Sequence, residues 1–351
     1  MKFCAVTRLI AFVALATYLA GTTPAWARLI NGGTAGAPLA EVGGDCDGSL
    51  YAATTVETWA NLTGSFTDVG GWNAIRFGNG YAAHLNLDCN IGAGDAGDAY
   101  AWGGIHFGYS GNVDGSTFTV NSGTVYADRL FVGGSASTTA TGKVTVVITG
   151  GTIDTQYGVQ LGVGATSTFD VTQTGGTVSW KANGIAVGVA GSGIYTISGG
   201  ELITTDGGTG AMVISAGSTF HVDGAKAKVF VLNKFRLVGT AIFTVHPDGV
   251  SPLEVGGLND SEQGGEIKMA LAPGFTPSQG ALYDLIDTDH TPFNLSSLPI
   301  TLSPENAGEW EFAVKEGDYT VLQARYLLPE PATMTLLGLG VLGLMARRRR
   351  H

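Results

Sequence analysis

The chain has 351 residues, of which 55 are glycine, 13% are charged and 44% are hydrophobic, and its formal net charge is −11. The hydrophobic content argues against a disordered chain. The excess of acidic residues argues against nucleic acid or an anionic lipid surface as a partner of the folded body.

Residues 1–27 are predicted to be a secretory signal. Its parts are a basic start (Lys2, Arg8), an apolar run (residues 9–19) and a small-x-small cleavage site (Ala25, Ala27). Cleavage there would give a mature chain that starts at Arg28. The alternative is a retained membrane helix, for which the apolar run is short.

Residues 28–100 are predicted to form a polar N-terminal cap with one or two irregular coils, because the repeat described below is only faintly present there. Residues 92–98 faintly resemble a calcium-binding Gly-Asp repeat. Such repeats bind calcium in tandem, since adjacent turns share each ion. This copy stands alone, so we predict no metal site.

Cys46 and Cys89 remain once the predicted signal, which contains Cys4, is removed. In an oxidising compartment two remaining cysteines indicate one disulfide, which would hold the N-terminal end together. The alternative is a pair of buried thiols, because spacing alone gives no geometry.

Residues 101–229 repeat one short pattern. Two apolar residues at alternate positions precede a corner, and further alternating apolar pairs follow it. The corners, which begin 28, 25, 24 and 25 residues apart, are Ser122-Gly123-Thr124, Gly150-Gly151-Thr152, Gly175-Gly176-Thr177, Gly199-Gly200-Glu201 and Gly224-Ala225-Lys226. A repeat of this length with period-2 apolarity predicts a strand solenoid.

The apolar positions fall into columns that recur once per repeat. The two clearest columns are Val125, Ile153, Val178 and Leu202, and Leu130, Val159, Ile185 and Met212. We expect both to be buried, because such short strands acquire a core only when coils stack. Gln173 interrupts an apolar column, which predicts either a hydrogen-bonded buried amide or a bulge.

The predicted fold is all-β: a parallel β-helix solenoid with three strands per coil. This body resembles those of autotransporters and pectate lyases, and the resemblance implies right-handed winding. Residues 230–327 lack the corner motif, and we expect them to form a β-rich C-terminal cap. The strands predicted there are 235–238, 242–245, 266–271 and 282–286, followed by a hairpin of 309–314 and 319–324.

Residues 328–351 have three parts in order. These are the motif Pro329-Glu330-Pro331, an apolar run over residues 332–346 and the basic cluster Arg347, Arg348, Arg349 and Arg350. The tail resembles the PEP-CTERM sorting signal of Gram-negative bacteria. The resemblance implies recognition by a membrane peptidase of the exosortase class, and export linked to extracellular polysaccharide. The apolar run is near the lower limit for a membrane-spanning helix, and the arginines would keep its end in the cytoplasm.

The sequence shows no constellation of residues that predicts catalysis, a cofactor or a metal. Charged residues in the repeats are few, and they do not form one column. The candidates for enzyme chemistry are Asp128, Arg129, Asp154, Asp170, Lys181, Glu201, Asp206 and Asp223. Tyr126 and Tyr157 lie near the variable connection after the corner, where they could contact a glycan, whereas Trp180 falls in an inward column.

We therefore predict a non-enzymatic protein of the cell surface or extracellular matrix, with a structural or adhesive role in extracellular polysaccharide. It would cross the inner membrane transiently during export and would not bind nucleic acid. The alternative is a carbohydrate-active enzyme, either a polysaccharide lyase or a glycoside hydrolase, on the same scaffold. A cluster of carboxylates on one exposed face would favour the enzyme, and a surface of Ser, Thr, Asn and Gly would favour the matrix protein.

Overall fold

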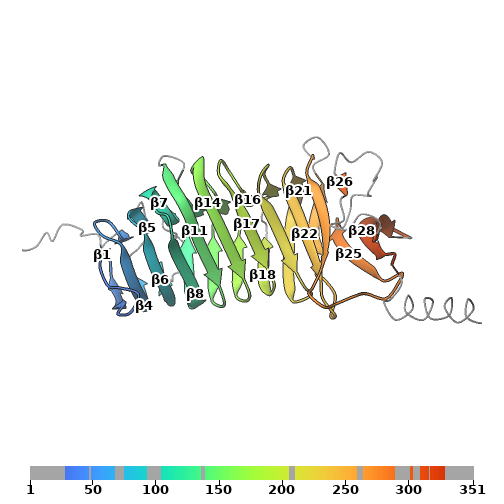
Figure 1. Ribbon diagram of the computed structural model, residues 1–351. Coiled ribbons are helices and arrows are strands. Elements are labelled where there is room, and N and C mark those ends of the chain that lie inside the picture. Colours follow the sequence, from blue (N-terminus) through green and yellow to red (C-terminus); the bar gives the residue numbers. More distant parts are fainter. Residues whose placement is uncertain are drawn as a thin grey trace, which may run out of the picture.

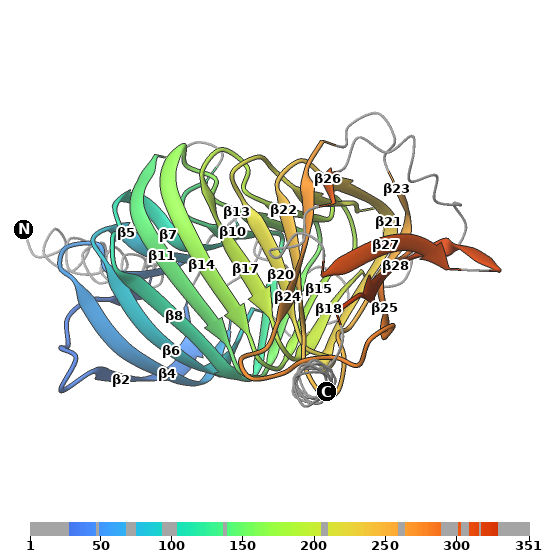
Figure 2. The same ribbon diagram turned by 45° about the vertical axis from the view of Figure 1, so that its right-hand side comes forward.

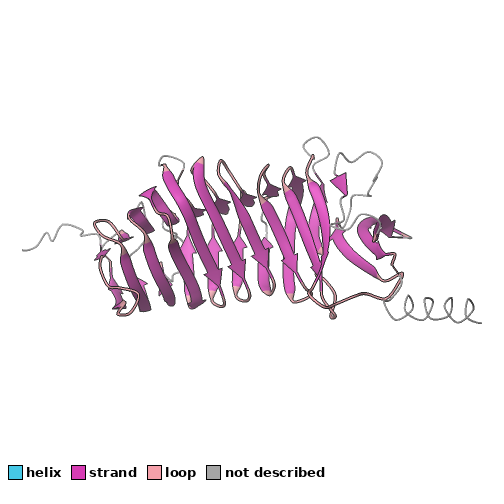
Figure 3. Cartoon of the chain, viewed as in Figure 1, coloured by secondary structure: helices cyan, strands magenta, loops and turns pink. Residues whose placement is uncertain are grey.

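The structure, a computed structural model, describes residues 28–46, 49–67, 75–92, 104–135, 139–204, 210–258, 264–288, 301–302, 309–315 and 317–328. Within these residues every regular element is a β-strand (Figure 3). The strands stack side by side in chain order and form an elongated body (Figure 1). The predicted signal peptide, Asp206 and the predicted sorting tail lie outside the described residues.

The strands pair in parallel along three faces of the body. The first face consists of β2 (Leu39–Asp45), β4 (Thr58–Thr67), β6 (Ala83–Ile91), β8 (Ser116–Ser122), β11 (Ala140–Ile148), β14 (Thr166–Gln173), β17 (Ser192–Ile197), β20 (Thr219–Asp223), β22 (Thr240–Val245), β24 (Glu266–Leu271) and β26 (Thr301–Leu302). The second face consists of β9 (Thr124–Ala127), β12 (Thr152–Thr155), β15 (Thr177–Trp180), β18 (Gly200–Thr204), the first half of β21 (Ala227–Leu237), β23 (Leu253–Leu258) and β25 (Leu282–Asp287). The third face consists of β1 (Arg28–Ile30), β3 (Leu50–Ala52), β5 (Ile75–Gly80), β7 (Ile105–Asn112), β10 (Leu130–Val132), β13 (Val159–Leu161), β16 (Ile185–Val187), β19 (Met212–Ile214) and the second half of β21. The body is therefore a parallel β-helix solenoid.

The interior is built from the predicted apolar columns. The column of Val125, Ile153, Val178 and Leu202 is in register on the second face, and each member is at most 1% exposed. The column of Leu130, Val159, Ile185 and Met212 is in register on the third face and is also buried. Both predictions are confirmed. Burial of each such side chain contributes about 1.5–3 kcal/mol before the entropy of ordering is subtracted.

The glycine corners connect the first face to the second. Gly151, Gly176 and Gly200 have φ angles of 71°, 69° and 79°. A Cβ atom at Gly176 would lie 2.6 Å from the carbonyl oxygen of Gly150 in the preceding coil. Glycine is needed at these corners for two reasons: it adopts the left-handed backbone conformation, and it has no Cβ atom to collide with the stacked corner of the preceding coil. The repeat is thus visible in the sequence because each central coil turns at a glycine corner.

Gln173 is fully buried and its amide group is satisfied. Its Nε2 donates to the carbonyl oxygens of Gly176 and Glu201, at 3.2 and 2.9 Å. Its Oε1 accepts a hydrogen bond of 2.6 Å from the hydroxyl of Tyr195, which is also buried. Of the two interpretations left open by the sequence, the buried amide is therefore the one observed.

The parallel register extends beyond residues 101–229 in both directions. Strands β1 to β6 already pair in parallel on the first and third faces, with a register shift between Val42 and Gly44 in the β2–β4 pair. Beyond Val229, pairing continues through β22–β24 and β23–β25. The sequence predicted only irregular coils and a β-rich cap in these segments because they lack the glycine corner that marks the central coils.

An antiparallel hairpin follows the last parallel strands. β27 (Trp310–Lys315) pairs with β28 (Asp318–Tyr326), and β28 also pairs with β25 (Figure 2). The predicted hairpin is confirmed, with Gly317 at φ 78° in its turn. Trp310 packs edge-on against Tyr326, with ring centroids 5.1 Å apart. The hairpin closes one edge of the solenoid with buried aromatic contacts.

Candidate functional site: a groove on the second face

The outward side chains of the second face form one rank along the body. They alternate with the buried column, and each is in register with the next. The members are Tyr126, Asp154, Ser179, Ile203, Phe230, Glu254 and Asp287. Neighbouring members stand one strand spacing apart, about 4.8 Å. The last three members therefore place an aromatic ring and two carboxyl groups on adjacent strands.

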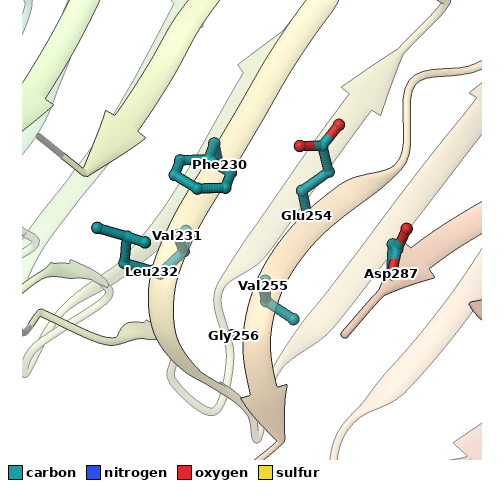
Figure 4. Close-up of a pocket in the computed structure, with 7 residues that line it drawn as sticks. All are labelled: Phe230, Val231, Leu232, Glu254, Val255, Gly256 and Asp287. Carbon is teal, nitrogen blue, oxygen red and sulfur yellow. The ribbon is translucent and has the colours of Figure 1, made fainter. Parts of the chain in front are cut away.

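These three residues line a groove of about 300 Å³. Its lining residues, which we call the C-terminal groove, are Phe230, Val231, Leu232, Glu254, Val255, Gly256 and Asp287. Figure 4 shows Phe230, Glu254 and Asp287 following one another across the neighbouring strands. This volume is at the lower end of the range of small-ligand sites.

The groove forms where the solenoid departs from its repeat. β21 does not stop at a corner but runs from the second face to the third as one strand. Its register with β23 shifts between Val231 and Lys234, and Leu232 there is 43% exposed. Gly256 lies beside this bend, and a Cβ atom on it would come within 2.1 Å of the Leu232 carbonyl oxygen. The irregular strand and the glycine together allow the surface to be concave.

The chemistry of the C-terminal groove is mixed. Phe230 and Leu232 give it apolar surface, whereas Glu254 and Asp287 give it two carboxyl groups. None of its seven lining residues is basic. An apolar surface beside hydrogen-bond acceptors is typical of sites for small polar ligands with apolar faces.

The sequence did not single out these residues. Phe230 follows directly after the last recognisable repeat, and Glu254 and Asp287 belong to coils without the corner motif. The one available signal was the alternation in residues 227–231, where Ala227, Val229 and Val231 are buried and Phe230 is not. The sequence did not show that Glu254 and Asp287 lie beside Phe230, because this depends on how β21, β23 and β25 are aligned, which only the structure gives.

The predicted glycan contacts, Tyr126 and Tyr157, are not part of this groove. Tyr126 belongs to the same outward rank but stands four strands away from Phe230, about 19 Å along the body. Tyr157 lies in the connection after β12, with the Arg129 guanidinium 5.6 Å from its ring centroid. Both rings are partly exposed, and their role in glycan contact stays a prediction. Trp180 is fully buried, as predicted.

The charged candidates in the central repeats are dispersed. Their contacts are Lys143 Nζ to Asp170 at 2.9 Å, Lys228 Nζ to Glu201 at 3.4 Å, His246 Nε2 to Asp223 at 2.7 Å and Ser179 Oγ to Asp154 at 2.9 Å. Asp170 and Asp223 lie on the first face, but Glu201 and Asp154 lie on the second. Burial raises the pKa of Asp128, and the neighbouring Arg129 partly opposes that shift. These groups do not form one catalytic cluster.

The cysteine pair is not joined in the structure. Cys46 and Cys89 are buried and present as thiols. Cys46 adjoins the end of β4 through a hydrogen bond to Thr67, whereas Cys89 lies on β6, on the other side of β4. Two strand spacings, about 10 Å, exceed the Cα separation of about 7 Å that a disulfide tolerates. The predicted bridge therefore has no support in this arrangement, and a thiol assay on denatured, unreduced protein should find two thiols per mature chain.

The environment of Cys89 also suppresses its reactivity. Burial, together with the charge of the adjacent Asp88, raises the pKa of Cys89 to about 12. The thiolate is the reactive form, so this thiol is protected from oxidation and alkylation at neutral pH. Its assigned role is therefore packing in the N-terminal coils.

An aromatic and cationic cluster on the third face was not anticipated. Tyr51, Arg76, His106 and Phe131 follow one another in register. The Arg76 guanidinium donates to the Tyr51 hydroxyl at 2.8 Å and lies over the Tyr109 ring at 4.6 Å from its centroid. His106 and Phe131 stack at 4.6 Å and are almost completely buried. These contacts hold the N-terminal coils together.

No group of three or more potential metal ligands occurs within the described part of the chain. Asp95 and Asp98, from the stretch that resembles a calcium-binding repeat, lie outside that part. In the same described ranges, no helix has the length and apolar character needed to cross a membrane.

Residues 328–350 match the PEP-CTERM protein-sorting motif. The match includes Pro329, Glu330, Pro331 and the four arginines, and it implies export to the cell surface through a C-terminal sorting signal. Exosortase, a membrane protease, recognises this motif, which implies a partner of that kind. No curated protein matches the chain.

Proposed function

We propose that this exported β-solenoid is a structural or adhesive protein of the cell surface or extracellular matrix, associated with extracellular polysaccharide. The observation that carries the proposal is the sorting motif at residues 328–350, joined to an elongated repetitive body. We infer that the body is a right-handed helix with a coil of three strands as its unit. The protein needs no cofactor in this role.

The outer surface of the first face supports this role. One outward rank consists of Asn61, Asn86, Thr119, Val147, Thr172 and Thr196, all in register. Hydroxyl and amide groups donate and accept hydrogen bonds, as the hydroxyl groups of a glycan do. A rank that is polar at every position except Val147 therefore suits many weak contacts along an extended polysaccharide.

The proposed route depends on both ends of the chain. The signal peptide would be cleaved between Ala27 and Arg28, and the tail would hold the protein in the inner membrane until an exosortase cuts near Pro329-Glu330-Pro331. The arginines would keep the end of the tail in the cytoplasm. The acidic body, with 12 basic and 28 acidic residues outside the two predicted end segments and thus a net charge of −16, would not bind nucleic acid.

Replacement of Pro329-Glu330-Pro331 by alanines tests the route. The variant should accumulate in the inner membrane as an uncleaved form, whereas mass spectrometry of the wild-type protein should show a chain without residues 332–351. A wild-type protein that keeps its tail in a strain with the processing enzyme would contradict the proposal. Replacement of Arg325, outside the motif, is the matched control and should leave processing intact.

A carbohydrate-active enzyme is the second candidate, and one observation favours it. Glu254 and Asp287 stand in register on adjacent strands of the C-terminal groove. Carboxyl pairs about 5–10 Å apart carry out glycoside hydrolysis. Release of reducing ends from polysaccharide, lost in Glu254→Gln, would support the enzyme. Absence of product with protein that binds the same polysaccharide would support the structural role.

A further inference from the structure

We propose that Arg28 and Glu41 form a latch that closes the N-terminal end of the solenoid core, and that the latch closes only after the signal peptide has been cut off between Ala27 and Arg28. The second half of this inference rests on the export route proposed above. The first half stands on the contacts of the first coil alone.

The two charged side chains of the latch occupy inward positions. Arg28 is in register with Leu50 and Ile75, which are both fully buried. Glu41 is paired with Leu62, which is also fully buried. Charged groups in such positions are costly unless they are paired. Opposite charges therefore replace apolar side chains at the first position of two inward columns, one on the third face and one on the first.

These two side chains meet across the end of the core. Arg28 Nη2 lies 3.0 Å from Glu41 Oε2 and also donates to the carbonyl oxygen of Val42 at 2.8 Å. The guanidinium carbon lies 5.0 Å from the centroid of the Phe66 ring, which is fully buried. The Arg28 and Glu41 side chains are 26% and 27% exposed, so solvent screens this ion pair only in part. The latch thus joins the third face to the first.

The latch lies where the solenoid is most open to association. Within the described part of the chain, β1 pairs only with β3, and β2, at the N-terminal end of the first face, pairs only with β4 (Figure 2). Such an edge can template pairing with another chain, and inward-pointing charges and bulges are two features that prevent this. Both occur here, because the β2–β4 register also shifts between Val42 and Gly44. An open latch would therefore loosen the first coil and expose this edge.

Arg28 would be the first residue of the mature chain, which connects the latch with signal cleavage. Its backbone nitrogen donates to the Ser49 carbonyl oxygen at 2.9 Å, so β1 is hydrogen-bonded from its first residue. A peptidase binds the residues on both sides of the cut bond as an extended segment, and Arg28 cannot fill that site while it is paired with β3.

The cut also changes the donor at Arg28. Hydrolysis of the Ala27–Arg28 peptide bond consumes one water and leaves a carboxyl group on the released signal and an amino group on Arg28. Once protonated, that amino group would donate a charge-assisted hydrogen bond to Ser49. Cleavage would therefore come first and stabilise the closed first coil.

Cys46 provides the measurement. It is 1% exposed and its backbone nitrogen donates to the Thr67 carbonyl oxygen, so a maleimide reaches its thiol only when the first coil opens. Cys89→Ser leaves Cys46 as the one thiol of the predicted mature chain. In purified protein with this background, Glu41→Gln and Arg28→Ala should each raise the labelling rate about tenfold, and the double variant should add little.

A matched control separates the latch from ion pairs in general. Lys143→Ala breaks the Lys143–Asp170 pair of 2.9 Å on the first face, in the central coils, and should leave the labelling rate of Cys46 unchanged. Glu41→Gln leaves the cleavage site intact, so its effect does not depend on processing. Thermal denaturation of each variant shows whether the other coils are folded. Unchanged labelling of Cys46 in the folded Glu41 and Arg28 variants would overturn the latch.

Ala27→Leu tests the order of events, since a bulky residue at this position of the site blocks the cut. In membranes from cells that produce this precursor with Cys46 as its only cysteine, labelling should be as fast as in mature Arg28→Ala protein. Trp26→Ala, at the unconstrained middle position of the site, is the control and should be cut and protected. Slow labelling of uncut Ala27→Leu protein would show that closure does not need cleavage, and would overturn the second half of the inference.

Two separate readouts keep this inference distinct from the proposed function. Mass spectrometry of the exported wild-type protein gives its first residue, and a first residue other than Arg28 would overturn the connection between latch and cleavage. Failure of export is read from cell fractionation. It would remove the proposed function and leave the labelling of the purified protein as the test of the latch.

Discussion

The central coils, residues 116–223, and the C-terminal coils, residues 227–287, share one parallel register but differ in how they turn. The central coils turn at stacked glycines, with Thr177 N and Glu201 N donating to the carbonyl oxygens of Gly151 and Gly176. The C-terminal coils have no such corner, and β21 bends through the position as one strand. Where the coils turn at glycine corners, the outward polar side chains form ordered ranks. Where the corner is missing, at β21, the surface forms the groove.

The comparison shows that identical pairing does not make the two regions equivalent in function. In the central coils, the repeat places similar side chains side by side over a long surface. A single departure from it concentrates an aromatic ring and two carboxyl groups in one place. We therefore expect substitutions in the central coils to affect folding, and substitutions in the groove to affect binding.

The largest effect should come from Ile153→Asp. Ile153 is fully buried between Val125 and Val178, so the substitution would bury an unpaired carboxylate at a cost of several kcal/mol and prevent folding. Limited proteolysis and circular dichroism provide the measurement. A cooperatively folded Ile153→Asp protein with unchanged Tm would contradict the inward placement of the column.

The next effect concerns the corner itself. Gly176→Ala should destabilise by about 2–4 kcal/mol, because the Cβ atom meets both an unfavourable φ and the Gly150 carbonyl. Gly115→Ala is the control: its φ is 80°, but no atom lies within 4 Å of the added Cβ. The control should cost only about 1 kcal/mol. Equal losses in urea denaturation would show that φ, and not corner stacking, limits this position.

A smaller effect is expected within the buried amide network. Tyr195→Phe removes one hydrogen bond to Gln173 and should cost about 1–3 kcal/mol, since the amide oxygen is left without that donor. In a Gln173→Ala background the tyrosine hydroxyl has already lost this acceptor, so the same substitution should be neutral or stabilising. A double-mutant cycle of unfolding free energies measures the coupling. Additive losses would contradict the network.

The smallest effect on stability should come from Glu254→Gln in the groove. The carboxyl group is exposed and faces Asp287, so its neutralisation should change the free energy of unfolding by at most about 0.5 kcal/mol. Chemical denaturation at neutral pH measures this. A loss of several kcal/mol would show that the carboxyl group is structural and would remove the contrast between the two regions.

The sequence was sufficient to predict the solenoid where a local rule repeats. Gly151, Gly176 and Gly200 mark equivalent turns, and the alternation around Ile153 and Val178 reveals an inward face. These signals are local, because φ and side-chain alternation are properties of a few consecutive residues. The columns and the hairpin follow from them, whereas for Gln173 they left a buried amide and a bulge as alternatives.

The rest depends on register between segments that share no motif. Glu254 and Asp287 are 33 residues apart in sequence, and nothing local indicates that they are neighbours. The N-terminal coils were predicted only as one or two irregular ones for the same reason, since Leu50, Ile75 and Ile105 align without a corner to mark them. The sequence also could not show that strand β4 lies between Cys46 and Cys89, which is why spacing alone suggested a disulfide.

The last strand, β28, ends next to the sorting motif. The ladder of the β27–β28 hairpin continues to Leu327, whose backbone nitrogen donates to the Glu309 carbonyl oxygen at 2.8 Å. The motif match begins at residue 328. The described ladder therefore ends directly beside the residues that the motif matches. A peptidase that acts at the motif would meet the β27–β28 hairpin next to the segment it cuts, so substitutions that loosen β28 should change the rate of processing.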